Sequence, residues 1–142
     1  MITPLSVNDV DKIILLYDGK FEDGWNREML VSAYDGGRFY AFGKEIAGRI
    51  IGFIGVTLSA DFADIESVFV DGEFRNAGVA FSLIERAKEF VLENGLSKIL
   101  LEVKENNLSA IRLYEKCGFN VIGCRKKYYP DGKDAFIMEW EK

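Results

Sequence analysis

The chain has 142 residues, of which 49% are hydrophobic and 29% are charged, and this length fits one compact domain. Its 18 Lys and Arg residues against 23 Asp and Glu residues give a net charge of −5, which argues against nucleic acid as a partner. The chain has no histidine, and this excludes His-based triads, His general bases and every metal site that uses a histidine ligand.

The two cysteines, Cys117 and Cys124, are too few for a disulfide scaffold or a four-cysteine zinc site. We expect both to be reduced, buried thiols in a cytoplasmic protein. The longest apolar stretches, such as 50–58, are interrupted by glycine and are too short to cross a bilayer. The composition therefore predicts a protein without a metal ion and without a membrane partner.

Two helices are predicted in the N-terminal part of the chain. Ser6, with Asp9 three residues later, is typical of a helix N-terminus, and apolar residues then recur at helical spacing over 10–17. Gly19 is expected to end this helix. A second, weaker helix is predicted over 26–34, before an Asp-Gly-Gly run that stops it.

The middle of the chain predicts strands followed by a long helix. Strands begin at 39–42, and the apolar runs 46–58 and 65–70 are rich in β-branched and aromatic residues, which indicates successive antiparallel strands. Apolar residues then recur at helical spacing over 79–91, which predicts the clearest helix of the chain. Asn94-Gly95 is a typical C-terminal stop for it.

A buried strand is predicted next, over 98–103. Either Asn106 or Asn107 can cap the following helix, in which Leu108, Ile111 and Tyr114 recur at helical spacing. The chain then predicts a final hairpin, with strands in 121–129 and 135–140 around a Pro-Asp-Gly turn. After the two N-terminal helices the predicted order is ββαβαββ, a mixed α/β layer fold without the regular alternation of a doubly wound sheet.

The segment 75–80, of sequence RNAGVA, joins a buried strand to the long helix. Small residues there let backbone N–H groups at a helix N-terminus approach an anionic group, where the helix dipole also favours negative charge. The segment matches neither the GxxxxGK[ST] motif of a P-loop nor the GxGxxG motif of a dinucleotide fold. On spacing alone, a phosphate site and an ordinary strand-to-helix turn both remain open.

A family resemblance emerges when this loop is read with the residues that follow it. The chain from about 65 to 138 resembles the GNAT acetyltransferase superfamily, whose pyrophosphate loop has the pattern Arg/Gln-x-x-Gly-x-Gly/Ala; Arg75, Gly78 and Ala80 fit it. The stretch after the loop resembles the N-alpha-acetyltransferases of ribosomal proteins, the RimI branch. It carries, in order, LEV, Asn, Ala, LY, GF and YYPDGKDAFIM. The resemblance implies a GNAT fold over 1–142, with a central, mostly antiparallel mixed sheet of about seven strands flanked by about four helices.

The resemblance also implies acetyl-CoA as the co-substrate. The main chain of Val68 and Val70 is expected to hold the pantetheine arm, and Asn107 is expected to contact the co-substrate near its thiol end. The loop is expected to wrap the pyrophosphate through its backbone amides. Its residues are Arg75, Asn76, Ala77, Gly78, Val79 and Ala80.

In the RimI branch the glutamate of LEV serves as general base and the tyrosine of LY as general acid, and these positions are Glu102 and Tyr114 here. An attacking amine must be neutral, so a glutamate can take its proton, and a phenol can protonate the leaving thiolate. On the residues alone, Glu102 could instead be a solvent-facing charge on a strand and Tyr114 a core aromatic residue. No metal is required.

Glu66 is the second candidate base. Strand alternation places Asp64, Glu66, Val68 and Val70 on one face of the strand that is expected to hold the co-substrate. Other GNAT enzymes resemble this arrangement and use a carboxylate from that strand.

The site for the acceptor is the least determined part of the sequence. In related N-terminal acetyltransferases the loop between the first two helices and the final hairpin line the peptide groove, and these segments are 21–26 and 126–130 here. Trp25, Tyr128 and Tyr129 could grip an N-terminal residue, or could equally pack against the sheet. The loop keeps only Trp25 of the proline-tryptophan-serine run that is expected of the ribosomal-protein branch.

We therefore predict an acetyl-CoA-dependent N-acetyltransferase that transfers the acetyl group directly to the α-amine of a protein or peptide. One alternative is an enzyme of the same fold that acetylates a small amine, such as a polyamine, an amino acid or an aminoglycoside. Another is a non-catalytic module that binds acyl-CoA. The edge strands of the last hairpin could also pair between two chains to give a homodimer.

Overall fold

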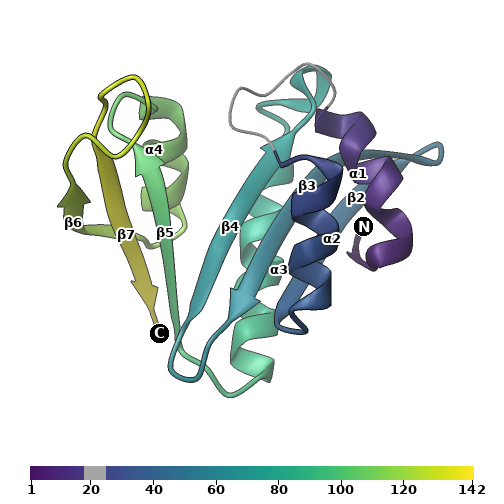
Figure 1. Ribbon diagram of the computed structural model, residues 1–142, viewed down its shortest axis with the longest axis horizontal. Helices are drawn as coiled ribbons and strands as arrows, with labels where there is room; N and C mark the ends of the chain where they lie inside the picture. Colours follow the sequence, from purple (N-terminus) through teal and green to yellow (C-terminus); the bar gives the residue numbers. More distant parts are fainter. Residues whose placement is uncertain (18–24) are drawn as a thin grey trace.

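The computed structural model describes residues 1–17 and 25–142, which form a seven-stranded sheet with four α-helices (Figure 1). The sheet order is β1-β2-β3-β4-β5-β7-β6, and every neighbouring pair is antiparallel except β4 and β5. The strands are β1 (Ile2–Leu5), β2 (Phe39–Ile46), β3 (Arg49–Leu58), β4 (Ala63–Val70), β5 (Lys98–Lys104), β6 (Asn120–Arg125) and β7 (Ala135–Glu141). The helices are α1 (Val10–Tyr17), α2 (Arg27–Asp35), α3 (Val79–Glu93) and α4 (Leu108–Lys116), with short 3-10 turns η1 (Val7–Asp9) and η2 (Gly72–Phe74). The predicted mixed sheet and helix count are confirmed.

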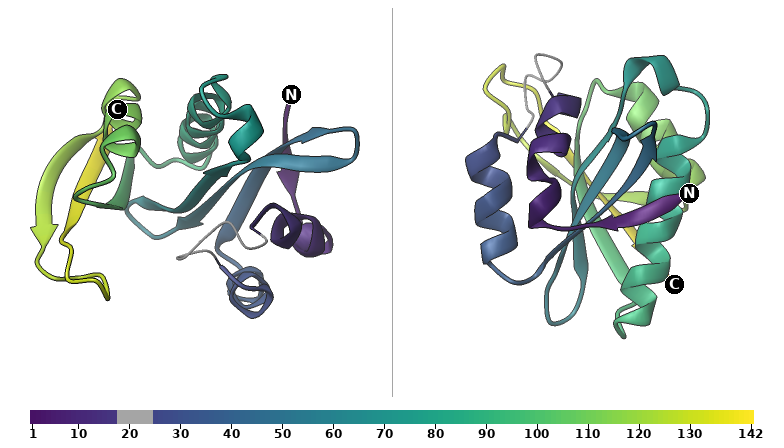
Figure 2. Two further views of the ribbon diagram at one scale, coloured as in Figure 1. Left: turned by 90° about the horizontal axis from the view of Figure 1, so that it is seen from above. Right: turned by 90° about the vertical axis from the view of Figure 1, so that its right-hand side faces the viewer.

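The helices cover the two faces of the sheet in pairs. Figure 2 shows α1 and α2 on one face and α3 and α4 on the other. Two clusters of buried residues follow from this layering: one beneath α3 and α4, which includes Phe119 and Met138, and one beneath α1 and α2, which includes Leu30 and Phe53. Burying an apolar side chain of this size stabilises the fold by about 1.5–3 kcal/mol, so the two clusters hold the layers together.

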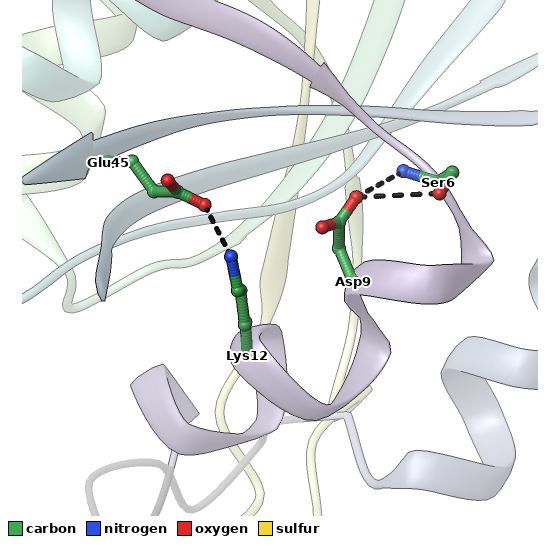
Figure 3. Close-up of polar contacts among 4 residues, drawn as sticks. All are labelled: Ser6, Asp9, Lys12 and Glu45. Atoms are coloured by element: carbon green, nitrogen blue, oxygen red, sulfur yellow. Dashed lines mark hydrogen bonds and ion pairs between the residues drawn. The ribbon is translucent and has the colours of Figure 1, made fainter. Parts of the chain in front are cut away.

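The first helix begins with the cap that the sequence predicts. The Asp9 carboxylate accepts a hydrogen bond from the Ser6 backbone N–H at 2.8 Å, and together they form a capping box (Figure 3). One turn later, Lys12 Nζ lies 3.1 Å from Glu45 Oε1, which ties α1 to the end of β2 (Figure 3). Both groups of this ion pair are partly exposed, so its contribution to stability is under about 1 kcal/mol. Gly19, the predicted end of the helix, lies outside the described residues.

Three strand boundaries differ from the prediction. The N-terminal residues form β1, and β6 is shorter than the predicted 121–129. The apolar run 46–58 is not one strand, because Ala47 and Gly48 turn with φ of 52° and 77°. Two successive residues with positive φ match the twist of a tight hairpin, so β2 extends to Ile46 and β3 starts after the turn.

A β-bulge interrupts β4. Gly55 of β3 pairs with Ser67, whereas the next residue, Val56, pairs with Ile65, so Glu66 is an extra residue on β4. An inserted residue of this kind shifts the side-chain alternation by one.

The predicted common face of Asp64, Glu66, Val68 and Val70 is therefore wrong. Val68 and Val70 pack with the cluster beneath α3, as does Ile65 before the bulge. Asp64 and Glu66, which flank Ile65, lie on the opposite face of the strand. The bulge thus separates the two acidic side chains from the valines.

The single parallel pair of strands in the described sheet opens at one end. Only Ala63 with Ile99 and Asp64 with Leu100 are paired, and beyond them β4 and β5 diverge (Figure 1). Over 68–70, the backbone N–H and C=O groups of β4 that point toward β5 are therefore not paired with that strand. Unpaired strand groups need a partner, so this is a natural place for a ligand's polar chain.

The two cysteines differ from the prediction of two buried thiols. Both are free, but Cys117 is buried and Cys124 is exposed. Cys124 lies on β6, which pairs only with β7 at the edge of the sheet. Within the described residues, no helix is long and apolar enough to traverse a lipid bilayer.

Candidate functional site

A cleft of about 860 Å³ lies where β4 and β5 diverge. Its walls come from the end of β4, from the loop and first turn of α3, and from α4. Of the nine residues predicted to contact the co-substrate, eight line this cleft and only Ala77 does not. Tyr114 lines it as well. The structure thus gathers segments that are far apart in the sequence into one cavity.

The start of α3 forms an open cradle of backbone groups. Gly78 precedes the helix in the left-handed conformation, with φ of 80°, and no side chain caps the helix. The first helical hydrogen bond runs from Ser82 N–H to the Gly78 carbonyl, and no acceptor within the described chain is found for the N–H groups of 79–81. Such free N–H groups at the positive end of a helix bind anions. Ala80 lies in the helix with negative φ, so its side chain adds no backbone strain.

Sequence reasoning missed one strip of the cleft. Ser109, Arg112 and Lys116 of α4 line it, and their spacing of three and four residues places them on one stripe of the helix. This periodicity is visible in the sequence, but the prediction for α4 followed the apolar residues at helical spacing, of which Tyr114 lines the same cleft.

Tyr114 is held by the fold of α4 and the residues after it. Asn107 begins the helix by accepting a hydrogen bond from the Ala110 N–H at 3.3 Å, which decides between the two predicted caps. The Tyr114 ring lies 6.1 Å from that of Phe119. Burial, with smaller effects from Cys117 and Tyr129, raises the pKa of Tyr114 to about 12. The phenol therefore stays protonated at neutral pH and can donate a proton into the cleft.

Three carboxylates gather on the opposite face of the sheet. Burial and then the nearby Glu102 raise the pKa of Asp64. Burial, Asp64 and Glu102 raise the pKa of Glu66, against a lowering by a hydrogen bond with Thr57. Because Glu102 acts on both Asp64 and Glu66, the structure places the two candidate bases, Glu66 and Glu102, near each other. Neither lies in the wall of the cleft that holds Tyr114.

Arg125 balances part of this negative charge. Its Nε lies 3.5 Å from Glu102 Oε1, and the Glu102 side chain is 32% exposed. The same guanidinium lies over the ring of Tyr128, 5.4 Å from its centroid. The pair links β5 to the end of β6 and holds the Glu102 carboxylate beside the final hairpin.

The aromatic residues predicted for the acceptor have different environments. Trp25 packs on Phe39, with ring centroids 5.3 Å apart, and belongs to the cluster beneath α1 and α2. Tyr128 is 50% exposed and touches Tyr129 edge-on, with centroids 5.2 Å apart. The other predicted loop residues, 21–24, lie outside the described residues. Of the three, Tyr128 offers the most free aromatic surface.

Residues 10–119 match the Acetyltransferase (GNAT) family. The chain belongs to this family.

Relatives of known activity agree with this assignment. The Escherichia coli K12 [ribosomal protein bS18]-alanine N-acetyltransferase is 32% identical over 117 residues, which cover 80% of this chain and 78% of that protein. A crystal structure of the ribosomal-protein-S18-alanine N-acetyltransferase from E. coli superimposes with a TM-score of 0.91 at 28% identity, over 99% of this chain and 92% of that one. The chain is thus a GNAT N-acetyltransferase with the fold that the resemblance implies.

A second similar structure carries a ligand. It is a Bacillus anthracis protein, assigned as a streptothricin acetyltransferase and solved in complex with acetyl coenzyme A. It has a TM-score of 0.69 at 30% identity, over 74% of this chain and 63% of that one. GNAT proteins related to this chain therefore include one assigned to a small-molecule acceptor.

The cradle of this GNAT enzyme can be tested at Gly78. Gly78→Ala should destabilise the protein by about 1 kcal/mol, because a Cβ is disfavoured at positive φ. A Cβ at Gly78 would meet no atom within 4 Å, so it would occupy open space beside the start of α3 without a clash. We expect acetyl-CoA affinity, measured by calorimetry, to fall about tenfold through loss of close approach to the N–H groups.

Gly48 provides the matched control for this substitution. It has φ of 77°, also meets no atom within 4 Å, and lies in the β2–β3 turn. Gly48→Ala should give a similar loss of stability with unchanged affinity. Equal affinities in the two variants would contradict a ligand-binding role for the cradle.

The crowding of carboxylates predicts that removing one of their charges stabilises the fold in a pH-dependent way. A carboxyl group with a raised pKa stabilises the fold below its unfolded pKa, and this contribution is lost as the pH rises through the folded pKa. Asp64→Asn should therefore raise the melting temperature at pH 7.5. The corresponding gain in the free energy of unfolding should be under about 1 kcal/mol, because the site is partly solvated. The gain should vanish near pH 4. Asp61→Asn, in the exposed turn before β4, should leave the melting temperature unchanged at both pH values.

Proposed function

We propose that this GNAT enzyme transfers an acetyl group from acetyl-CoA directly to the α-amine of a protein or peptide. The observation that carries the proposal is the opening between β4 and β5, with a protonated phenol on one side and a group of carboxylates on the other. The relatives that act on a ribosomal-protein alanine support the choice of an α-amine.

The cleft fits the co-substrate in shape and chemistry. Its N–H cradle at 79–81 suits a pyrophosphate, and the unpaired β4 backbone beside Val68 and Val70 suits an amide-containing arm such as pantetheine. Asn107 lies at the start of α4, where we propose that it contacts the arm near its thiol end. The thioester then lies near Tyr114.

Two side chains of this chain handle the protons. Glu102 accepts the proton of the attacking amine, directly or through a water molecule, while the amine nitrogen forms a bond to the thioester carbon. Tyr114 donates its proton to the CoA sulfur as the carbon–sulfur bond breaks. An α-amine, with a pKa near 8, needs less help to become neutral than a lysine near 10.4, which favours the N-terminal acceptor.

A covalent route through cysteine has little support. Cys117 is buried, and burial raises the pKa of its thiol above the usual range despite the opposing effect of Lys88. A thiolate is the nucleophilic form, so this thiol is a poor acyl acceptor. Direct transfer between two bound substrates remains the proposed route.

The acceptor class can be identified by mass spectrometry. The protein is incubated with acetyl-CoA and a panel of N-terminal peptides, internal-lysine peptides and polyamines, and the mass gain of each acceptor is measured. Acetylation at peptide N-termini supports the proposal. Acetylation of free amines alone favours the small-molecule alternative, to which the acidic face and the assigned streptothricin enzyme both point. Acetyl-CoA binding without any acetylated product would favour a binding module.

A further inference from the structure

The cleft collects positive charge in a protein that is acidic overall. The chain carries a net charge of −5, yet the charged residues that line the cleft are Arg75, Arg112 and Lys116, with no Asp or Glu among them. Cations are commonly neutralised by nearby carboxylates on such a surface. Within the described residues, no ion pair involves any of these three side chains.

The three cations come from two opposite walls of the cleft. Arg75 belongs to the loop before α3, and its guanidinium lies over the ring of Phe69, 5.9 Å from the centroid. Arg112 and Lys116 lie one helical turn apart on α4, and both residues are exposed. The cradle of free N–H groups belongs to the same wall as Arg75. The α4 wall therefore holds a second, separate concentration of positive charge.

We infer that Arg112 and Lys116 form a second phosphate subsite, on α4 across the cleft from the cradle. This inference rests on the proposed use of acetyl-CoA, which carries a pyrophosphate and a 3′-phosphate. The cradle can satisfy only the anion that reaches the start of α3, and the remaining phosphate charge needs cations elsewhere. An arginine can bind phosphate oxygens through two parallel N–H groups, and a lysine adds a mobile point charge.

The subsite is tested with three variants, one control variant and three ligands. Arg112→Ala, Lys116→Ala and the double variant are compared with Arg38→Ala, which removes an exposed arginine outside the cleft. Calorimetry gives the Kd of acetyl-CoA and of dephospho-acetyl-CoA, which lacks the 3′-phosphate. The kcat/KM with acetyl-pantetheine, which lacks both phosphate groups, reports on the rest of the site.

The double variant should bind acetyl-CoA about tenfold more weakly, with less difference at high salt, because exposed charges are screened. Arg38→Ala should match the wild type. The kcat of the double variant at saturating acetyl-CoA, and its kcat/KM with acetyl-pantetheine, should be unchanged. If the loss disappears with dephospho-acetyl-CoA, the subsite binds the 3′-phosphate; if it persists with that ligand, the subsite binds the pyrophosphate.

Two results would overturn the subsite. One is an unchanged Kd for acetyl-CoA in the double variant, and the other is an equal loss with acetyl-pantetheine, which would indicate a general distortion of α4. These results differ from a failure of the proposed function. If the wild-type protein binds acetyl-CoA but acetylates no acceptor, only the proposed function is contradicted. If it does not bind acetyl-CoA, both the proposed function and the phosphate subsite are contradicted.

Discussion

Replacing Tyr114 with phenylalanine should lower kcat by about 100-fold or more and leave acetyl-CoA affinity within about twofold. The substitution removes only the hydroxyl group, so the ring keeps its packing near Phe119 and its place in the wall of the cleft. The pKa of about 12 keeps the phenol protonated through the working pH range, as a proton donor requires. Without this donor the CoA thiolate leaves unprotonated.

Tyr40→Phe is the matched control for this variant. Tyr40 is also a tyrosine on an ordered element, packed against Phe90 with centroids 4.9 Å apart, but it does not line the cleft. Steady-state kinetics at saturating acetyl-CoA should give the wild-type kcat for Tyr40→Phe. A wild-type kcat for Tyr114→Phe would instead make Tyr114 an ordinary core aromatic residue.

Much of the lining of the cleft could be predicted from local motifs, through the GNAT resemblance that they carry. The loop 75–80 carries its own geometry, because Gly78 adopts a conformation that few residues other than glycine allow and the helix start supplies the N–H groups. Asn107 and Tyr114 follow from one helix, whose cap and apolar spacing are visible in the sequence. These features depend on residues near one another in the chain.

The face of the acidic residues could not be predicted in the same way. Strand alternation assigned Asp64, Glu66 and Val68 to one face, and a single extra residue at Glu66 moved the valine to the other. Whether a strand bulges depends on how it pairs with its neighbour, which the sequence of β4 alone does not reveal. The exposure of Cys124 has a similar origin, since it depends on the place of β6 at the edge of the sheet.

The two candidate bases lie close together on one face of the sheet, and isosteric substitutions can distinguish their roles. Glu102→Gln should lower kcat/KM at pH 7 by about 100-fold or more, as expected for loss of a general base. Arg125 holds the Glu102 carboxylate on β5, the strand that diverges from β4 at the proposed thioester site. Glu66→Gln should retain most of the activity, because Glu66 lies in the bulge of β4 and a hydrogen bond with Thr57 engages its carboxylate.

The pH dependence separates a base from a group that only binds the acceptor. A lost base leaves the enzyme dependent on amine that is already neutral, and the neutral fraction of an α-amine rises tenfold per pH unit below its pKa near 8. The deficit of Glu102→Gln should therefore shrink as the pH rises toward 9, whereas loss of a binding charge for the ammonium form would not be repaired there. A profile in which Glu66→Gln shows the large, alkali-rescued deficit would move the base role to β4. The Glu102–Arg125 pair would then serve to orient the acceptor rather than to deprotonate it.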